Sequence, residues 1–166
     1  MAGPFRIEAL GPRHVRQGFS CGVEALDRYF LEHASQDVRR RATACYVALE
    51  SATDKVAGYY TLAAAGIPLA DIPAPIIKRL PRYPSVPVAR VGRLAVDLGY
   101  QGRRLGGALL WDAMGRALRS EVAVFALAVD AEDERAEAFY LHHGFVGFGS
   151  APRQLILPLD KDSVMR

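Results

Sequence analysis

The order of three consecutive segments in the second half of the chain constrains the fold most strongly. Residues 86–97 are rich in β-branched side chains, and residues 104–118 carry apolar side chains at the spacing of an amphipathic helix. Residues 122–129 are almost wholly apolar, which is typical of a strand buried on both faces, as parallel strands are. Because a helix that joins two parallel strands makes a right-handed crossover, this order predicts an α/β fold.

The first half of the chain predicts further elements of a sheet. Residues 5–10 indicate a strand, and residues 22–40 carry apolar side chains at helical spacing. Residues 43–50 and 55–62 are β-prone runs separated by a polar turn, so we expect them to pair as a hairpin. Four prolines limit residues 72–84 to a short helix or a structured loop.

The C-terminal part predicts a second helix and two short strands. We expect the helix over residues 132–143, with Asp130 or Asp133 as its cap and Gly144 at its end. The two strands are expected over residues 145–148 and 154–157.

Length and composition indicate one domain. The chain has 166 residues, of which 51% are hydrophobic, so residues 1–166 can bury a core of their own as a single domain. The longest apolar stretch is too short to span a membrane, and the N-terminus lacks the apolar core of a secretory signal. Cys21 and Cys45 are too few for a disulfide framework. These features predict a cytoplasmic protein without a membrane segment.

Charge is clustered along the chain, although the net charge is only +3. Basic residues gather at positions 39–41, 78–82 and 103–104, and acidic residues gather at positions 130–134. Such runs are usually solvated surface, but an anionic ligand would also need basic clusters of this kind.

A glycine-containing loop joins the strand predicted at residues 86–97 to the helix that follows it. Helix N-termini present unpaired N–H groups and the positive end of the helix dipole, so this geometry suits phosphate binding. Rossmann and P-loop sites are rival interpretations of such a loop. Residues 98–107 lack both the G-x-G-x-x-G spacing and the G-x-x-x-x-G-K-[ST] lysine, which argues against these rivals.

The same segment resembles the GNAT superfamily of acetyltransferases. The string Arg93-Leu-Ala-Val-Asp97 is similar to the fourth strand of that family, and Gln101 begins a match to its [RQ]-x-x-G-x-[GA] pyrophosphate loop. A register that starts at Arg103 also fits the pattern but lies two residues late. In the Gln101 register Arg104 replaces the central glycine, so its backbone must take a conformation that glycine adopts freely.

The resemblance implies that acetyl-CoA is the acetyl donor and that it binds to the strand end and the loop. The implied binding residues are Leu94, Ala95, Val96, Gln101, Gly102, Arg103, Arg104, Leu105, Gly106 and Gly107. The resemblance also implies the GNAT fold, a mixed central sheet of about six to seven strands flanked by about four helices.

A second segment, residues 129–145, resembles the A-x-x-F-Y-x-x-x-G-F helix of the same superfamily. Two matches in the right order are stronger evidence than either alone. The resemblance implies that Tyr140 is the general acid that protonates the leaving thiolate of coenzyme A, and it adds Phe139 to the acetyl-CoA site. The residues alone leave open that Tyr140 is a packing aromatic on the core face of a helix.

The implied chemistry needs little besides these two segments. An amine attacks the thioester carbonyl, and family analogy places the oxyanion donors on the backbone N–H groups from Leu94 to Val96. No covalent enzyme intermediate and no metal are required. His142 and His143 are adjacent on the predicted helix and point in different directions, which favours a solvated helix end over a base or a metal pair.

Most of the chain is similar to one branch of the superfamily, the TacT/AtaT-type toxins of bacterial toxin–antitoxin systems. This resemblance is carried by strings that include Phe19-Ser-Cys-Gly22, Gly58-Tyr-Tyr-Thr-Leu62 and Leu80-Pro-Arg-Tyr-Pro84. It implies acetylation of the α-amine of aminoacyl-tRNA, which blocks translation. It also implies a cognate antitoxin as a partner and a homodimer.

An α-amine acceptor is compatible with a sequence in which no strong base stands out. Its pKa is near 8, so about one molecule in ten is neutral at pH 7. Basic residues could hold the tRNA backbone, namely Arg39, Arg40, Arg41, Lys78, Arg79, Arg82, Arg90 and Arg93. Two other functions stay open: an acetyltransferase of a small-molecule, peptide or protein amine, and a non-catalytic regulatory module that binds acetyl-CoA.

Overall fold

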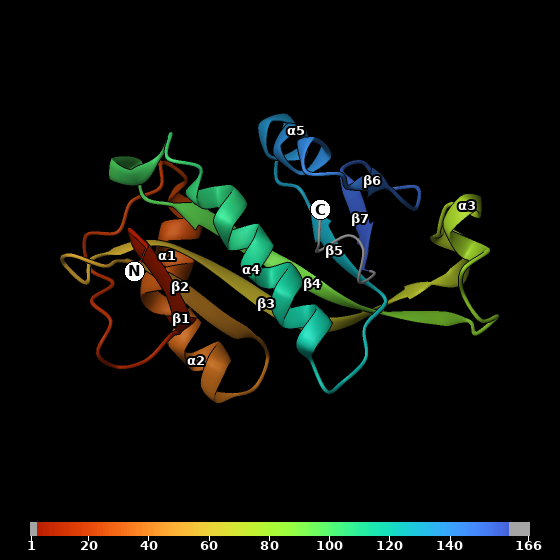
Figure 1. Cartoon of the computed structure of the whole chain (residues 1–166), viewed down its shortest axis with the longest axis horizontal. Coiled ribbons are helices and arrows are strands. Elements are labelled where there is room, and N and C mark those ends of the chain that lie inside the picture. The colour runs from red at the N-terminus through yellow and green to blue at the C-terminus, as the bar shows by residue number, and fades with distance from the viewer. Residues whose placement is uncertain (1–2, 160–166) are drawn as a thin grey trace. The chain divides into compact units, whose positions relative to one another are not determined.

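Seven strands form one mixed sheet in the computed structural model, which describes residues 3–159 (Figure 1). Their order across the sheet is β1-β2-β3-β4-β5-β7-β6. The strands are β1 (Phe5–Ala9), β2 (Ala44–Glu50), β3 (Val56–Pro68), β4 (Ser85–Val96), β5 (Ala126–Asp130), β6 (Val146–Gly147) and β7 (Gln154–Pro158). The helices are α1 (Glu24–Glu32), α2 (Ala34–Arg39), α3 (Ala74–Ile77), α4 (Leu105–Arg119) and α5 (Glu134–His142), with short 3-10 turns η1 (Leu69–Asp71) and η2 (Leu98–Tyr100). The expected mixed sheet is confirmed.

The chain divides into two compact units, and each unit is built from two separate segments. Within the described residues, unit 1 comprises 3–63 and 92–113, and unit 2 comprises 64–91 and 114–159. The loop predicted to bind pyrophosphate therefore belongs to unit 1, and Tyr140 belongs to unit 2.

An aromatic cluster holds the N-terminal helices of unit 1 against its strands. β1 pairs antiparallel with β2, and β2 pairs antiparallel with β3, which confirms the predicted hairpin. Tyr59 of β3 stacks on Phe30 of α1 with ring centroids 4.3 Å apart, and its hydroxyl donates to the Leu26 carbonyl at 2.7 Å. Both rings are fully buried, so apolar burial and a satisfied hydroxyl fix α1 on β3.

The helical segment predicted over residues 22–40 consists of two helices. His33 takes a non-helical conformation, with φ −122° and ψ −26°, and separates α1 from α2. The Tyr29 hydroxyl donates to Asp37 at 2.8 Å and links the two helices. Apolar spacing alone does not reveal such a break, and this is one reason why the described residues contain five α-helices rather than about four.

β5 is the central strand of unit 2. Its first four residues are buried, and it pairs in parallel with β4 and antiparallel with β7. A strand buried on both faces is thereby confirmed, as is the order strand, helix, parallel strand. Because β7 closes the other side, the sheet is mixed rather than wholly parallel.

Several predicted strand boundaries were wrong. β5 begins at Ala126 rather than Val122, because Val122 lies in the connection from α4 and is 73% exposed. β3 continues beyond residue 62 to Pro68, and β6 has only two residues. Of the two candidate caps for α5, the structure selects Asp133, whose carboxylate accepts a hydrogen bond from the Ala136 N–H at 2.8 Å.

Candidate functional site

Two residues of the loop between β4 and α4 have a left-handed backbone conformation. Gly102 has φ +81° and Arg104 has φ +62°, so both residues lie in the left-handed region. Arg104 thus takes the conformation that the family's central glycine would adopt without strain. The substitution at position 104 changes the side chain while leaving the turn intact.

The first turn of α4 presents its backbone N–H groups at this loop. The Ala108 N–H donates to the Arg104 carbonyl at 3.2 Å, so the amides of Leu105, Gly106 and Gly107 precede the hydrogen-bonded part of the helix. Leu105 is buried and anchors the helix start, whereas Gly106 and Gly107 are partly exposed. Three amides at the positive end of a helix of 15 residues suit a pyrophosphate.

Two side chains hold this loop in place through hydrogen bonds to backbone groups. Asp97 is buried, and its carboxylate accepts hydrogen bonds from the Ser20 N–H at 3.0 Å and the Gly99 N–H at 2.9 Å. The Gln101 side-chain amide donates to the carbonyls of Cys21 and Val96 at 3.1 and 3.0 Å. Gln101 stays a predicted acetyl-CoA-binding residue, and its side-chain amide is bonded within the protein.

The end of β4 packs closely against β3 and α4. A Cβ atom at Gly58 of β3 would lie 2.9 Å from the Ala95 carbonyl oxygen and 3.1 Å from Leu109 of α4. Because glycine has no side chain, β4 and α4 can approach β3 closely at this point. Ala95 is 4% exposed, and Leu94 and Val96 are partly exposed. The ladder between β4 and β5 ends at Val91, so the segment from Leu94 to Val96 lies beyond it.

A second basic side chain of the loop lies over an aromatic ring. The Arg103 guanidinium carbon is 5.3 Å from the centroid of the Tyr100 ring. The Tyr100 hydroxyl donates to Glu50 at 3.2 Å. The pKa of Glu50 is lowered first by its hydrogen bond with Thr53, and Arg103 contributes to the shift.

In unit 2, Tyr140 is a buried tyrosine in an aromatic setting. It is 6% exposed, and its ring makes edge contacts with Phe139 and Phe145 at centroid distances of 5.1 and 5.3 Å. Residues 3–159 offer its hydroxyl no hydrogen-bond partner. Burial, with a smaller contribution from Glu132, raises the pKa of Tyr140. The phenol therefore stays protonated, as a general acid must be before it acts.

The basic residues predicted to contact tRNA fall in both units. Arg39, Arg40 and Arg41 are exposed at the end of α2 in unit 1, and Lys78, Arg79 and Arg82 are exposed after α3 in unit 2. The Arg93 guanidinium of unit 1 lies 3.4 Å from the centroid of the Tyr29 ring, which is a close cation–π contact.

Arg90 of β4 differs from the other basic residues. Its Nε atom is the one enclosed side-chain polar atom without a hydrogen-bond partner in the part of the chain that the structure describes. A buried donor of this kind is costly unless an acceptor satisfies it, so an anionic ligand would stabilise it.

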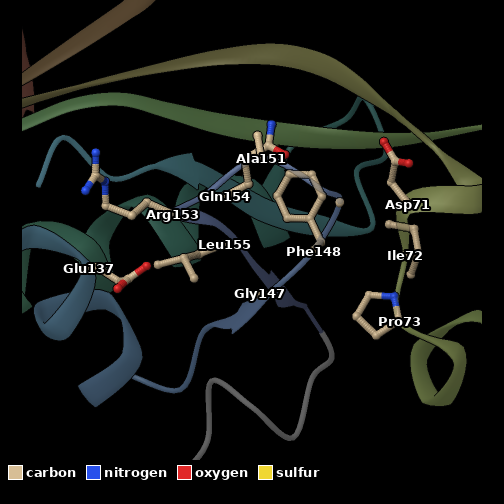
Figure 2. Close-up of a pocket in the computed structure, with 11 residues that line it drawn as sticks. Asp71, Ile72, Pro73, Glu137, Gly147, Phe148, Ala151, Arg153, Gln154 and Leu155 are labelled. Atoms are coloured by element: carbon tan, nitrogen blue, oxygen red, sulfur yellow. The ribbon is translucent and has the colours of Figure 1, made fainter. Parts of the chain in front are cut away.

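Unit 2 also contains a cavity that sequence reasoning missed. It has a volume of about 360 Å³ and lies between α5, the hairpin of β6 and β7, and the segment after η1 (Figure 2). Among its lining residues are Asp71, Glu137, Phe148 and Arg153. The one sequence signal for it is the position of Glu137 three residues before Tyr140, because the other walls come from distant parts of the chain.

The described residues show neither a metal centre nor a membrane span. Nowhere in residues 3–159 do three or more His, Cys, Asp or Glu side chains gather in a way that could hold a metal ion. The helices in the same range are all too short or too polar to cross a membrane. His142 and His143 lie with their rings 5.2 Å apart at 85°, and burial, followed by the charge of His142, lowers the pKa of His143.

The chain is similar to proteins with acetyltransferase names over most of its length. The model of the acetyltransferase (GNAT) family matches residues 13–145. A tRNA-acetylating toxin of Mycobacterium tuberculosis is 35% identical over 147 residues, which cover 87% of this chain and 86% of the toxin.

Solved structures of toxins share the fold. AtaT complexed with acetyl-methionyl-tRNAfMet matches with a TM-score of 0.84 and 30% identity, covering 93% of this chain and 94% of AtaT. A tyrosine-to-phenylalanine mutant of KacT matches with a TM-score of 0.86 and 28% identity over 98% of both chains. AtaTR bound with AcCoA matches with a TM-score of 0.80 and 28% identity, over 98% of this chain and 96% of that chain.

The family match covers the loop at the start of α4 and the α5 tyrosine, the same two features that the geometry singles out. The chain belongs to the GNAT family of acetyltransferases.

Proposed function

We propose that the protein is an acetyl-CoA-dependent N-acetyltransferase that acetylates the α-amine of aminoacyl-tRNA and thereby acts as a toxin that blocks translation. The observation that carries this proposal is the left-handed backbone of Arg104, which keeps the pyrophosphate turn in a chain without its central glycine. The similarity to a tRNA-acetylating toxin and to AtaT complexed with acetyl-methionyl-tRNAfMet supports the choice of acceptor.

Acetyl-CoA supplies an activated acetyl thioester, and residues of unit 1 would hold its phosphates. The backbone amides of Leu105, Gly106 and Gly107 face the pyrophosphate, while Gly102 and Arg104 shape the turn. Arg103 adds positive charge beside them. The N–H groups from Leu94 to Val96 act as donors to the oxyanion that develops on the thioester carbonyl.

The transfer step needs one proton donor from the chain. The neutral α-amine attacks the thioester carbonyl, a C–N bond forms, the C–S bond breaks, and the nitrogen loses its extra proton to water. Tyr140 gives its phenolic proton to the departing thiolate and recovers one from solvent. Burial also raises the pKa of a coenzyme A thiol beside the phenol. The pKa values of the proton donor and of the leaving group therefore shift in the same direction.

The charge distribution suits an acceptor with a phosphate backbone. The exposed arginines at the end of α2 and the basic residues after α3 offer phosphate contacts on both units. Arg90 of β4 is a further candidate for a phosphate contact through its guanidinium, whose enclosed Nε has no acceptor among residues 3–159.

The biological setting follows from the same relatives. AtaT has been solved bound to the C-terminus of the antitoxin AtaR, so a cognate antitoxin is the expected partner. Two further expectations are that residues 1–166 act as one GNAT domain and that the protein is cytoplasmic. A homodimer is also expected, and light scattering would test it.

A cell-free translation reaction tests the proposal. Adding the protein together with acetyl-CoA should stop synthesis of a reporter, while adding either alone should not. Tyr140→Phe, added at the same concentration, should leave synthesis running. Inhibition without acetyl-CoA, or equal inhibition by Tyr140→Phe, would contradict the proposal.

A further inference from the structure

The cavity of unit 2 lies next to the residue proposed to protonate the leaving thiolate. Glu137 lines the cavity and precedes Tyr140 by three positions on α5, so the two side chains are neighbours on the same side of that helix. A group bound against Glu137 would therefore sit within about one helical turn of the Tyr140 position. The cavity is placed to receive an acceptor rather than a remote effector.

Two carboxylates line this cavity, and neither forms an ion pair with the one cationic side chain of the lining, that of Arg153. Neither the Asp71 nor the Glu137 side chain has a hydrogen bond or an ion pair to any residue between 3 and 159. Figure 2 shows them on opposite sides of the Phe148 ring, with the Arg153 guanidinium directed away from both. The cavity thus offers negative charge on two sides, which favours a ligand with an ammonium group and disfavours one with a carboxylate.

The rest of the lining combines apolar side chains with Arg153 and Gln154, and the volume is small. Ile72, Phe148 and Leu155 contribute side chains from the hydrophobic part of unit 2, and Phe148 and Ile72 belong to its core. A cavity of about 360 Å³ is at the low end for a ligand site and suits an amino-acid residue better than a nucleotide.

We propose that this cavity receives the side chain of the acceptor's amino acid, with Asp71 and Glu137 in its walls rejecting acidic side chains. The proposal rests on the proposed function and adds to it an amino-acid specificity. Neutral and basic aminoacyl groups are accepted, and aspartyl and glutamyl groups are not. Like charges brought together in this cavity repel, which gives the rejection its physical basis.

The specificity is tested with pairs of charged tRNAs whose amino acids have nearly the same shape. The wild-type protein should acetylate Asn-tRNA and Gln-tRNA at least about tenfold more efficiently, in kcat/KM, than Asp-tRNA and Glu-tRNA. In the double variant Asp71→Asn, Glu137→Gln, this ratio should fall to within about threefold. Glu134→Gln, an exposed change one turn earlier on α5, is the matched control and should keep the wild-type ratio. Equal ratios in the wild type and the double variant would overturn the proposal.

A binding measurement without turnover separates this proposal from the proposed function. The probe is methionyl-adenosine with a stable amide link, titrated by calorimetry into the wild-type protein, Ala151→Phe and Ser150→Phe. Ala151 lines the cavity, while Ser150 is its exposed neighbour outside the lining, so only Ala151→Phe should weaken binding, by about tenfold or more. Thermal melting and acetyl-CoA binding confirm that the variants are folded.

The outcomes of the two measurements are independent. Absence of probe binding to the folded wild type, or equal binding to all three proteins, overturns the cavity proposal. Failure of the wild type to acetylate any charged tRNA overturns the proposed function, even where the probe binds and Ala151→Phe abolishes that binding.

Discussion

The loop at the start of α4 and the Tyr140 region of α5 differ in the groups that would carry out their proposed roles. The loop would use its backbone, and the α5 region would use a side chain. The loop is proposed to act through backbone N–H groups and two left-handed residues, so its chemistry would depend little on which side chains it bears. The α5 region is proposed to act through one phenol in a buried aromatic setting, so its chemistry would depend on a single side chain. Sequence changes of the same size should therefore have different consequences in the two regions.

Tyr140 and Tyr59 are both buried, but their hydroxyl groups differ in hydrogen bonding. The Tyr59 hydroxyl has an internal acceptor, the Leu26 carbonyl at 2.7 Å, whereas the Tyr140 hydroxyl has none within residues 3–159. A hydroxyl that has no internal partner and is not fully enclosed is available to an external ligand, whereas a satisfied one contributes to stability.

The largest effect is expected from Tyr140→Phe. It keeps the ring and deletes the hydroxyl, so kcat for acetyl transfer should fall by about 10²–10⁴-fold while the acetyl-CoA Kd and the melting temperature change little. Tyr59→Phe is the matched control. It should lower the free energy of unfolding by about 1–3 kcal/mol and leave kcat nearly unchanged. Wild-type turnover by Tyr140→Phe, with chemistry rate-limiting, would make Tyr140 a packing residue.

A smaller but clear effect is expected from Gly106→Val. A branched side chain at the first turn of α4 blocks the close approach of a phosphate to the backbone, so the acetyl-CoA Kd should rise by about tenfold or more, measured by calorimetry. Gly115→Ala, farther along the same helix, should keep the Kd. Unchanged affinity of a folded Gly106→Val variant would move the phosphate site away from this turn.

The pH dependence of kcat/KM should reflect the acceptor rather than Tyr140. The neutral fraction of an α-amine rises from about one in ten at pH 7 to about half at pH 8, so the rate should rise about fivefold over that interval and then level off. The pKa of Tyr140 is raised, so its proton is lost only at high pH and no fall in rate should appear below pH 10. A fall between pH 8 and pH 10 would show that Tyr140 ionises earlier than its burial implies.

The smallest effect is expected from Arg104→Gly. Glycine removes the strain of a left-handed arginine, but it also raises the conformational entropy of the unfolded chain. The net gain in the free energy of unfolding should therefore be about 0.5–1 kcal/mol. The acetyl-CoA Kd should change by less than about threefold. Arg104→Ala removes the same side chain and keeps the strain, so it should gain no stability. A large loss of affinity in both variants would mean that the Arg104 side chain itself holds the ligand.

The sequence predicted what depends on local patterns. The hairpin and the crossover from β4 through α4 to β5 follow from spacing and turn chemistry within about 40 residues of chain. The same signals gave Asp130 and Asp133 as candidate caps of α5, and the structure selects Asp133. In the Gln101 register the motif required Arg104 to take a conformation that glycine adopts freely, and the structure shows a left-handed backbone there. Local order was enough because a turn is shaped by neighbouring residues.

The sequence could not predict what depends on distant contacts. The break at His33 is spanned by a hydrogen bond between Tyr29 and Asp37, which apolar periodicity does not encode. The cavity brings Asp71 to the β6–β7 hairpin, where its carbonyl accepts a hydrogen bond from the Gly149 N–H at 2.9 Å. No motif marks such a pair, because the two residues are 78 positions apart in the sequence.

The most direct test of the central claim is the fate of the acetyl group. The protein is mixed with labelled acetyl-CoA and bulk charged tRNA, the RNA is digested with nuclease, and the aminoacyl-adenosine products are identified by mass spectrometry. The label should appear on the α-nitrogen of the amino acid, and it should be absent when the tRNA has been deacylated or when Tyr140→Phe replaces the wild type. Label on protein lysines or small amines instead, or none at all from folded protein that binds acetyl-CoA, would contradict the account.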